Sequence, residues 1–179
     1  MSANRSSKAN VRKRIRHLLG GLTDFEIESA SRDIRNRLVF PPGSKVAIFA
    51  GLSNEPQLLE LINEKPLVKW HLPKVNGPGR MNFIQVEDSR KLGIGAFGIL
   101  EPSDGPKASS LDFVVCPGVA FTKKGHRLGQ GGGFYDRIIP KFPMAHTVGV
   151  GFQCQLLAKI PFAQHDCVMD QIILSQTDR

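Results

Sequence analysis

Glycine gathers in one stretch of this 179-residue chain, at positions 125, 129, 131, 132 and 133, with Arg127 among the glycines and Asp136 just beyond them. Glycine lets the backbone approach a ligand closely and adopt positive φ, so that successive N–H groups can point at phosphate oxygens. The guanidinium of Arg127 is suited to two-pronged pairing with a phosphate. The carboxylate of Asp136 is suited to a magnesium ion that bridges phosphates. The stretch therefore predicts a phosphate-binding site that uses Mg²⁺.

Glycine-rich stretches also occur in ordinary turns, so the alternatives matter. This stretch lacks the G-K-[ST] ending of a P-loop, and no first strand–helix unit with a distal acid marks a dinucleotide-binding motif. The other interpretation is a flexible surface turn beside a packed aromatic pair, Phe134 and Tyr135. We favour an anion-binding site, which is neither a P-loop nor a dinucleotide-binding motif.

Apolar segments on both sides of the glycines indicate how such a site is positioned. Thr23 and Glu26 have the spacing of a capping box, which starts a helix. Alternating strand and helix patterns predict an α/β protein, a three-layer α/β/α sandwich with a largely parallel sheet. We expect helices over 8–22, 23–38, 55–64 and 134–139, and strands over 45–50, 67–72, 81–86, 111–116, 146–152 and 169–174.

The string P-G-V-A-F-T-K-K-G-H-R-L-G-Q-G-G-G-F-Y-D-R, residues 117–137, closely resembles the signature of the 5-formyltetrahydrofolate cyclo-ligase (5,10-methenyltetrahydrofolate synthetase) family. The resemblance extends from Lys8 to about Ile173. It implies one domain over 1–179 with a sugar-isomerase/CoA-transferase-like layout. It also implies a reaction in which ATP phosphorylates the formyl oxygen of 5-formyltetrahydrofolate, N10 attacks, and phosphate leaves to give 5,10-methenyltetrahydrofolate.

The same resemblance implies which residues bind ATP and Mg²⁺. By spacing alone Lys8, Arg12 and Arg16 form a solvated basic face of a helix, but the family places phosphate contacts at the first two positions. Arg127 and Tyr135 are the expected catalytic residues and Asp136 the expected metal ligand. The family often has two tyrosines where this chain has Phe134 and Tyr135. The expected ATP-binding residues are Lys8, Arg12, Arg127, Leu128, Gly129, Gln130, Gly131, Gly132, Gly133, Phe134 and Tyr135.

Four residues are expected at the folate. Glu55 matches a family glutamate that binds the pterin ring, although by position alone it also suits the first turn of a helix. Met81 matches a pocket residue, with ordinary core packing as the alternative. Phe97 matches an aromatic residue that stacks on the folate, and we place Tyr135 near the formyl group.

His165 and Asp166 are adjacent and invite a catalytic-dyad interpretation. No serine or cysteine nucleophile motif accompanies them, and adjacent residues seldom face one site. We therefore expect a structural role for both residues.

The net charge of +8 raises the possibility of nucleic-acid binding. No nucleic-acid motif is present, and ATP or a reduced folate with a polyglutamate tail accounts for the charge equally well. The N-terminus lacks an apolar signal core, no apolar run approaches a membrane span, and the three cysteines have no metal-type spacing. We expect a cytoplasmic monomer that binds a small-molecule substrate and neither nucleic acid nor membrane. A diverged paralogue that binds nucleotide or folate without catalysis and a basic nucleic-acid-binding module are the alternatives.

Overall fold

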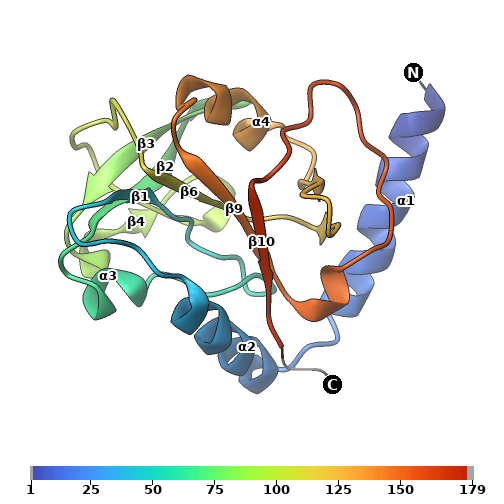
Figure 1. The fold of residues 1–179 in the computed structure, drawn as a ribbon, viewed down its shortest axis with the longest axis horizontal. Helices are drawn as coiled ribbons and strands as arrows, with labels where there is room; N and C mark the ends of the chain where they lie inside the picture. The colour runs from blue at the N-terminus through green and yellow to red at the C-terminus, as the bar shows by residue number, and fades with distance from the viewer. Residues whose placement is uncertain (1, 177–179) are drawn as a thin grey trace.

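The computed structural model describes residues 2–176, and its centre is one six-stranded sheet (Figure 1). Its strands are β1 (Lys45–Ala47), β2 (Lys69–Gly77), β3 (Arg80–Val86), β6 (Phe113–Cys116), β9 (His146–Gly151) and β10 (Gln171–Leu174). They lie in the order β10-β9-β6-β1-β2-β3. Every neighbouring pair is parallel except β2 and β3. The predicted, largely parallel sheet is confirmed.

Helices cover both faces of the sheet, as the predicted sandwich requires. The α-helices are α1 (Ser2–Leu19), α2 (Asp24–Arg37), α3 (Leu61–Glu64) and α4 (Phe134–Ile138). The first three share a core with Val46 of β1, whereas α4 belongs to a second core with the next residue, Ala47. Successive strand residues point to opposite faces, so α4 lies across the sheet from α2 and α3 (Figure 1). Among residues 2–176, no helix has the length and apolar character needed to cross a membrane.

The helix ends follow their local sequence. Thr23 is the N-cap of α2, because its hydroxyl accepts from the Glu26 N–H while Glu26 accepts from the Thr23 N–H at 2.7 Å. The predicted capping box is therefore confirmed. The first helix ends at Leu19, immediately before Gly20 and Gly21, and it begins earlier than the predicted residue 8.

The helix predicted over 55–64 is mostly wrong, since only α3 is helical there. Side-chain hydrogen bonds take the place of the helical ones. The Gln57 amide donates to the carbonyls of Leu52 and Glu55, both at 2.7 Å, and its backbone N–H donates to the Ser31 hydroxyl at 2.9 Å. Such local bonds offer the backbone an alternative to the helix. The segment 51–60 is therefore an irregular loop tied to α2.

The second predicted strand is longer than expected. It continues through Pro73 as β2 and forms a hairpin with β3, in which Pro73 is opposite Phe83. Proline is tolerated there because β2 has left the centre of the sheet and pairs only with the edge strand β3. Smaller hairpins follow between β4 (Gly93–Ile94) and β5 (Leu100–Glu101), and between β7 (Ala120–Phe121) and β8 (Arg127–Leu128).

Arg35 on α2 joins the helical layer to the irregular loop. Its buried guanidinium forms ion pairs with Glu28, Glu60 and Glu64, and it donates to the Gln57 carbonyl at 2.9 Å.

We expect Arg35→Met to lower the free energy of unfolding by about 1–3 kcal/mol, because the partners are half-exposed glutamates rather than buried ones. Urea denaturation measures the change. Arg32→Met on the same helix is the matched control, since Arg32 is exposed, and its effect should stay within about 0.5 kcal/mol. Equal effects of the two variants would contradict the role of Arg35.

Candidate active site

The glycine-rich stretch folds as the β7–β8 hairpin followed by a short loop, residues 129–133, that leads into α4. We call residues 129–133 the glycine loop. Gly131 has φ +117° and Gly133 has φ +65°, conformations that L side chains rarely adopt. A Cβ on Gly133 would also lie 2.7 Å from Nη1 of Arg137. Gly131 and Gly132 are exposed, so the loop presents backbone rather than side chains. Leu128, which precedes it, is buried in the core.

Basic side chains of α1 lie against this loop. Arg12 donates from Nε to the Gly129 carbonyl at 2.8 Å. Arg16 donates from Nε and Nη2 to Oε1 of Gln130, at 3.2 and 2.7 Å. The predicted phosphate ligands of the helix and of the loop are thus brought together. The sequence interpretation left Arg16 as a solvated residue, yet its spacing of four from Arg12 already placed it on the same side of the helix.

Arg127 and Asp136 meet each other at the base of the loop. Arg127 is buried, and its Nη2 donates to Oδ1 of Asp136 at 2.8 Å while its Nη1 donates to the Pro117 carbonyl at 3.1 Å. The N–H of Cys167 donates to the same Oδ1 at 3.2 Å. Within residues 2–176, Nε of Arg127 is buried without a hydrogen-bond partner. The spacing of nine residues between Arg127 and Asp136 did not predict this ion pair, which forms because β8 and α4 lie close together.

Tyr135 packs beside this pair. Its ring lies 5.5 Å from the guanidinium carbon of Arg127 and 6.4 Å, centroid to centroid, from Phe83. Its hydroxyl is buried and has no hydrogen-bond partner among the described residues. Burial raises the pKa of Tyr135 well above its ordinary value. The hydroxyl of Tyr135 is therefore a buried donor that lacks an acceptor among the described residues.

Glu55 lies in the loop after β1, where its carboxylate is buried. Its Oε2 accepts from the Leu52 N–H at 3.1 Å, and its Oε1 accepts from Nε2 of Gln130 at 3.2 Å. The structure thus brings the residue expected at the pterin into direct contact with the loop expected at the phosphates.

The two apolar residues expected at the folate have different settings. Met81 of β3 is buried in the second core, against which Phe134 and Tyr135 also pack. Phe97 is 72% exposed at the tip of the β4–β5 hairpin and has φ +59°, an uncommon value for a residue with a side chain. Its ring lies 6.1 Å, centroid to centroid, from that of Phe134, edge to face. An exposed ring held against Phe134, the first residue of α4, is available for stacking.

Asp166 connects the C-terminal part of the chain to α1. Its Oδ2 accepts from Nζ of Lys8 at 2.5 Å and from the Ala163 N–H at 2.7 Å. Burial raises the pKa of Asp166, but these hydrogen bonds outweigh it and hold the pKa below its ordinary value. The His165 ring is exposed, and its Nε2 lies 3.7 Å from Oδ1 of Asp166. Asp166 therefore anchors Lys8, a contact that we did not predict.

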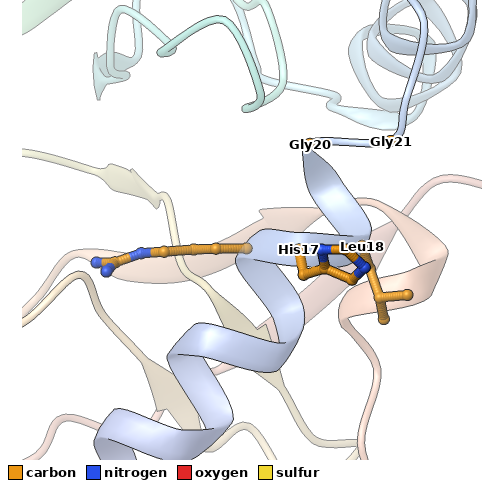
Figure 2. A pocket seen from close by; sticks show the side chains of 5 residues that line it. His17, Leu18, Gly20 and Gly21 are labelled. Atoms are coloured by element: carbon orange, nitrogen blue, oxygen red, sulfur yellow. The ribbon is translucent and has the colours of Figure 1, made fainter.

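A hollow of about 440 Å³ lies at the C-terminal end of α1, next to Arg16, and Figure 2 shows His17, Leu18, Gly20 and Gly21 around it. Among residues 2–176, no group of three histidine, cysteine, aspartate or glutamate side chains is arranged to hold a metal ion.

Comparison with known proteins gives one consistent result. Residues 4–175 match the model of the 5-formyltetrahydrofolate cyclo-ligase family. The 5-formyltetrahydrofolate cyclo-ligase of Escherichia coli K12 is 28% identical over 173 residues, which cover 89% of this chain and 95% of that protein. The NMR structure of 5,10-methenyltetrahydrofolate synthetase from Aquifex aeolicus is 31% identical, with a TM-score of 0.83 over 95% of this chain and 90% of that one. The Mycoplasma pneumoniae 5,10-methenyltetrahydrofolate synthetase, at 22% identity and a TM-score of 0.76, covers 93% of this chain and 97% of its own and shares the fold.

Proposed function

This chain belongs to the 5-formyltetrahydrofolate cyclo-ligase family, and from that premise we propose how its residues carry out the family's reaction. It is a ligase of one-carbon metabolism that converts 5-formyltetrahydrofolate to 5,10-methenyltetrahydrofolate with ATP. The observation that carries the proposal is the contact of α1 with the glycine loop. This contact collects cations and backbone N–H groups beside the buried Arg127 and Tyr135.

The ATP end of the site consists of α1 and residues 127–135. Lys8 has three donors and uses one of them on Asp166, so the others remain for a phosphate oxygen. Arg12 uses Nε on Gly129, which leaves its terminal nitrogens for a second phosphate oxygen. The backbone N–H groups of the glycine loop complete this cradle.

Asp136 fits a magnesium ion that accompanies the phosphates. Its Oδ1 accepts from Arg127 and from Cys167, and no described residue donates to its Oδ2. Magnesium takes one or two carboxylates from a protein and fills its other positions with water and phosphate oxygens, so a single available carboxylate oxygen suits it. When bound, the ion neutralises charge on the phosphates.

The folate end uses Glu55, Met81, Phe97 and Tyr135. The buried carboxylate of Glu55 accepts hydrogen bonds from the N–H groups of the pyrimidine side of the pterin. Phe97 stacks on the ring system, and Met81 lines the pocket behind it. The O–H of Tyr135 donates to the formyl oxygen, and the hydroxyl thereby gains a hydrogen-bond partner that it lacks among the described residues.

The chemistry follows from the low electrophilicity of the formyl carbon. The group is amide-like, and the nitrogen lone pair is delocalised into its carbonyl. Transfer of the γ-phosphoryl group to the formyl oxygen breaks the bond to ADP and creates a leaving group. N10 then bonds to the activated carbon and loses its proton, and the C–O bond breaks so that the oxygen departs with the phosphate. Arg127 stabilises the charge that develops during transfer, and the remaining residues hold the reactants in line.

The activity is tested by following the near-ultraviolet absorbance of the methenyl product with purified protein, magnesium-ATP and 5-formyltetrahydrofolate. We expect a rise that requires ATP. Absence of the rise while ATP still binds in calorimetry would favour the diverged-paralogue interpretation. We further propose that the chain acts as a single domain and a cytoplasmic monomer, accepts polyglutamylated substrate, and binds neither nucleic acid nor membrane.

The Glu55→Gln variant distinguishes the contribution of the folate-binding residues from that of the ATP-binding residues. The amide keeps one accepting oxygen but loses the charge, and hydrogen bonds to charged groups contribute about 1.5–3 kcal/mol. We expect KM for 5-formyltetrahydrofolate to rise by about tenfold or more, with a much smaller change in KM for ATP. Glu87→Gln, at an exposed position, is the control and should match the wild type. An unchanged folate KM in Glu55→Gln would remove Glu55 from the pterin site.

A further inference from the structure

A chain of hydrogen bonds runs from α1 through the glycine loop to Glu55. Arg16 donates to Oε1 of Gln130 at 2.7 and 3.2 Å and to the Gln130 carbonyl at 3.3 Å. Gln130 donates in turn from Nε2 to Oε1 of Glu55 at 3.2 Å. The two connections span 114 and 75 positions in the sequence. Gln130 is therefore the point where the proposed phosphate loop and the proposed pterin ligand touch.

The orientation of the Gln130 amide is determined by its two partners. A guanidinium only donates hydrogen bonds, and an ionised carboxylate only accepts them. The amide oxygen must therefore face Arg16, and the amide nitrogen must face Glu55. Gln130 is exposed, so packing does not hold its side chain. Arg16 fixes the direction in which Gln130 donates.

We propose that Arg16 and Gln130 are positioning residues that couple the binding of ATP to the binding of folate. The inference rests on the proposed function, in which the glycine loop holds the phosphates and Glu55 holds the pterin. An ionised carboxylate has about four acceptor sites, so Glu55 keeps its bond to Gln130 while it accepts from the pterin. In this proposal ATP binds the glycine loop that carries Gln130, and Gln130 donates to Glu55, so a loop position that suits ATP also keeps Glu55 in its folate-binding orientation. Both ligands favour the same arrangement of Arg16, Gln130 and Glu55, so each ligand strengthens the binding of the other.

The coupling is measured by calorimetry with the full chain. The Kd of 5-formyltetrahydrofolate is determined without nucleotide and with saturating magnesium–adenylyl imidodiphosphate, an ATP analogue that does not transfer its terminal phosphoryl group. The ratio of the two Kd values is the coupling factor. We expect a wild-type factor of at least about fivefold, the lower end of the usual range. A wild-type factor near one would overturn the proposal.

Three variants identify the residues responsible. Gln130→Ala and Arg16→Ala each break this chain of hydrogen bonds, so each should lower the coupling factor from about fivefold or more toward one. Arg16→Lys keeps the charge but loses the two-pronged donor, so it should lower the factor as well. Arg14→Ala is the matched control, because Arg14 is exposed on the same helix and two positions rotate it by about 200° from Arg16. It should keep the wild-type factor.

The outcomes separate this proposal from the proposed function. Wild-type coupling in Gln130→Ala would overturn the inference while methenyl formation still supports the reaction. An effect of Arg16→Ala on affinity for the analogue, restored by Arg16→Lys with the coupling factor unchanged, would make Arg16 a simple phosphate attractant and would also overturn the inference. Absence of methenyl formation by the wild type would contradict the reaction itself, which the coupling factor does not measure.

Discussion

Arg127→Lys lowers turnover by more than tenfold and by up to roughly the 100-fold typical of a lost group that stabilises transition-state charge. Lysine carries the charge, but it cannot reproduce the planar fork that reaches both Asp136 and Pro117. The expected signature is a loss in kcat that exceeds the change in either KM, because the charge that we propose Arg127 to stabilise develops during transfer. Steady-state kinetics by the methenyl absorbance measures both quantities.

The matched control for this variant is Arg90→Lys. Arg90 also pairs with an aspartate, Asp88 at 2.9 Å, but its side chain is 86% exposed and lies outside the site. Its kinetics should equal those of the wild type. Arg127→Ala is less informative, since breaking a buried ion pair costs about 3–5 kcal/mol of stability. Thermal unfolding must therefore accompany it. Near-normal turnover in a folded Arg127→Ala protein would exclude Arg127 from catalysis.

Asp136→Asn raises the magnesium concentration needed for half-maximal activity by about tenfold or more, the scale expected when a contact in a metal site is lost. Asparagine retains an oxygen that accepts from Arg127 and from the Cys167 N–H, so the local fold persists. The carboxylate charge that attracts the cation does not persist. A magnesium titration at saturating ATP and folate measures the shift.

The same titration distinguishes two roles of Asp136. If the carboxylate only orients Arg127, Asp136→Asn lowers kcat without shifting the magnesium midpoint, and the metal assignment is wrong. Asp170→Asn is the control, because Asp170 accepts from Thr147 at the β9–β10 edge instead. Its magnesium midpoint should not change.

The parts of the fold that depend on local patterns could be predicted from the sequence. Short apolar runs indicated the parallel strands, and Thr23 with Glu26 indicated the start of α2. The predicted helix over 55–64 failed because Gln57 forms side-chain hydrogen bonds to its own loop and its backbone bonds to Ser31, 26 positions away. Helical periodicity contains no information about such a partner.

In the candidate site, too, some features could be predicted from the sequence and others could not. The types and spacing of Arg127, Asp136 and the glycines indicated phosphate and magnesium, and the family match supports the reaction. The pairing of Arg127 with Asp136, the anchoring of Lys8 by Asp166, and the contact of Arg16 with Gln130 could not be predicted. Each of them joins segments that lie far apart in the sequence or on different elements, so it depends on the tertiary structure.

The Lys8–Asp166 contact joins positions 158 apart in the chain. Contacts of such separation are slow to form, since most of the chain must be ordered before they contribute. During synthesis Lys8 leaves the ribosome well before Asp166, because 158 positions separate the two residues. The proposed nucleotide end therefore cannot be completed until residue 166 has been made, and a chain that stops before it lacks the partner that holds Lys8.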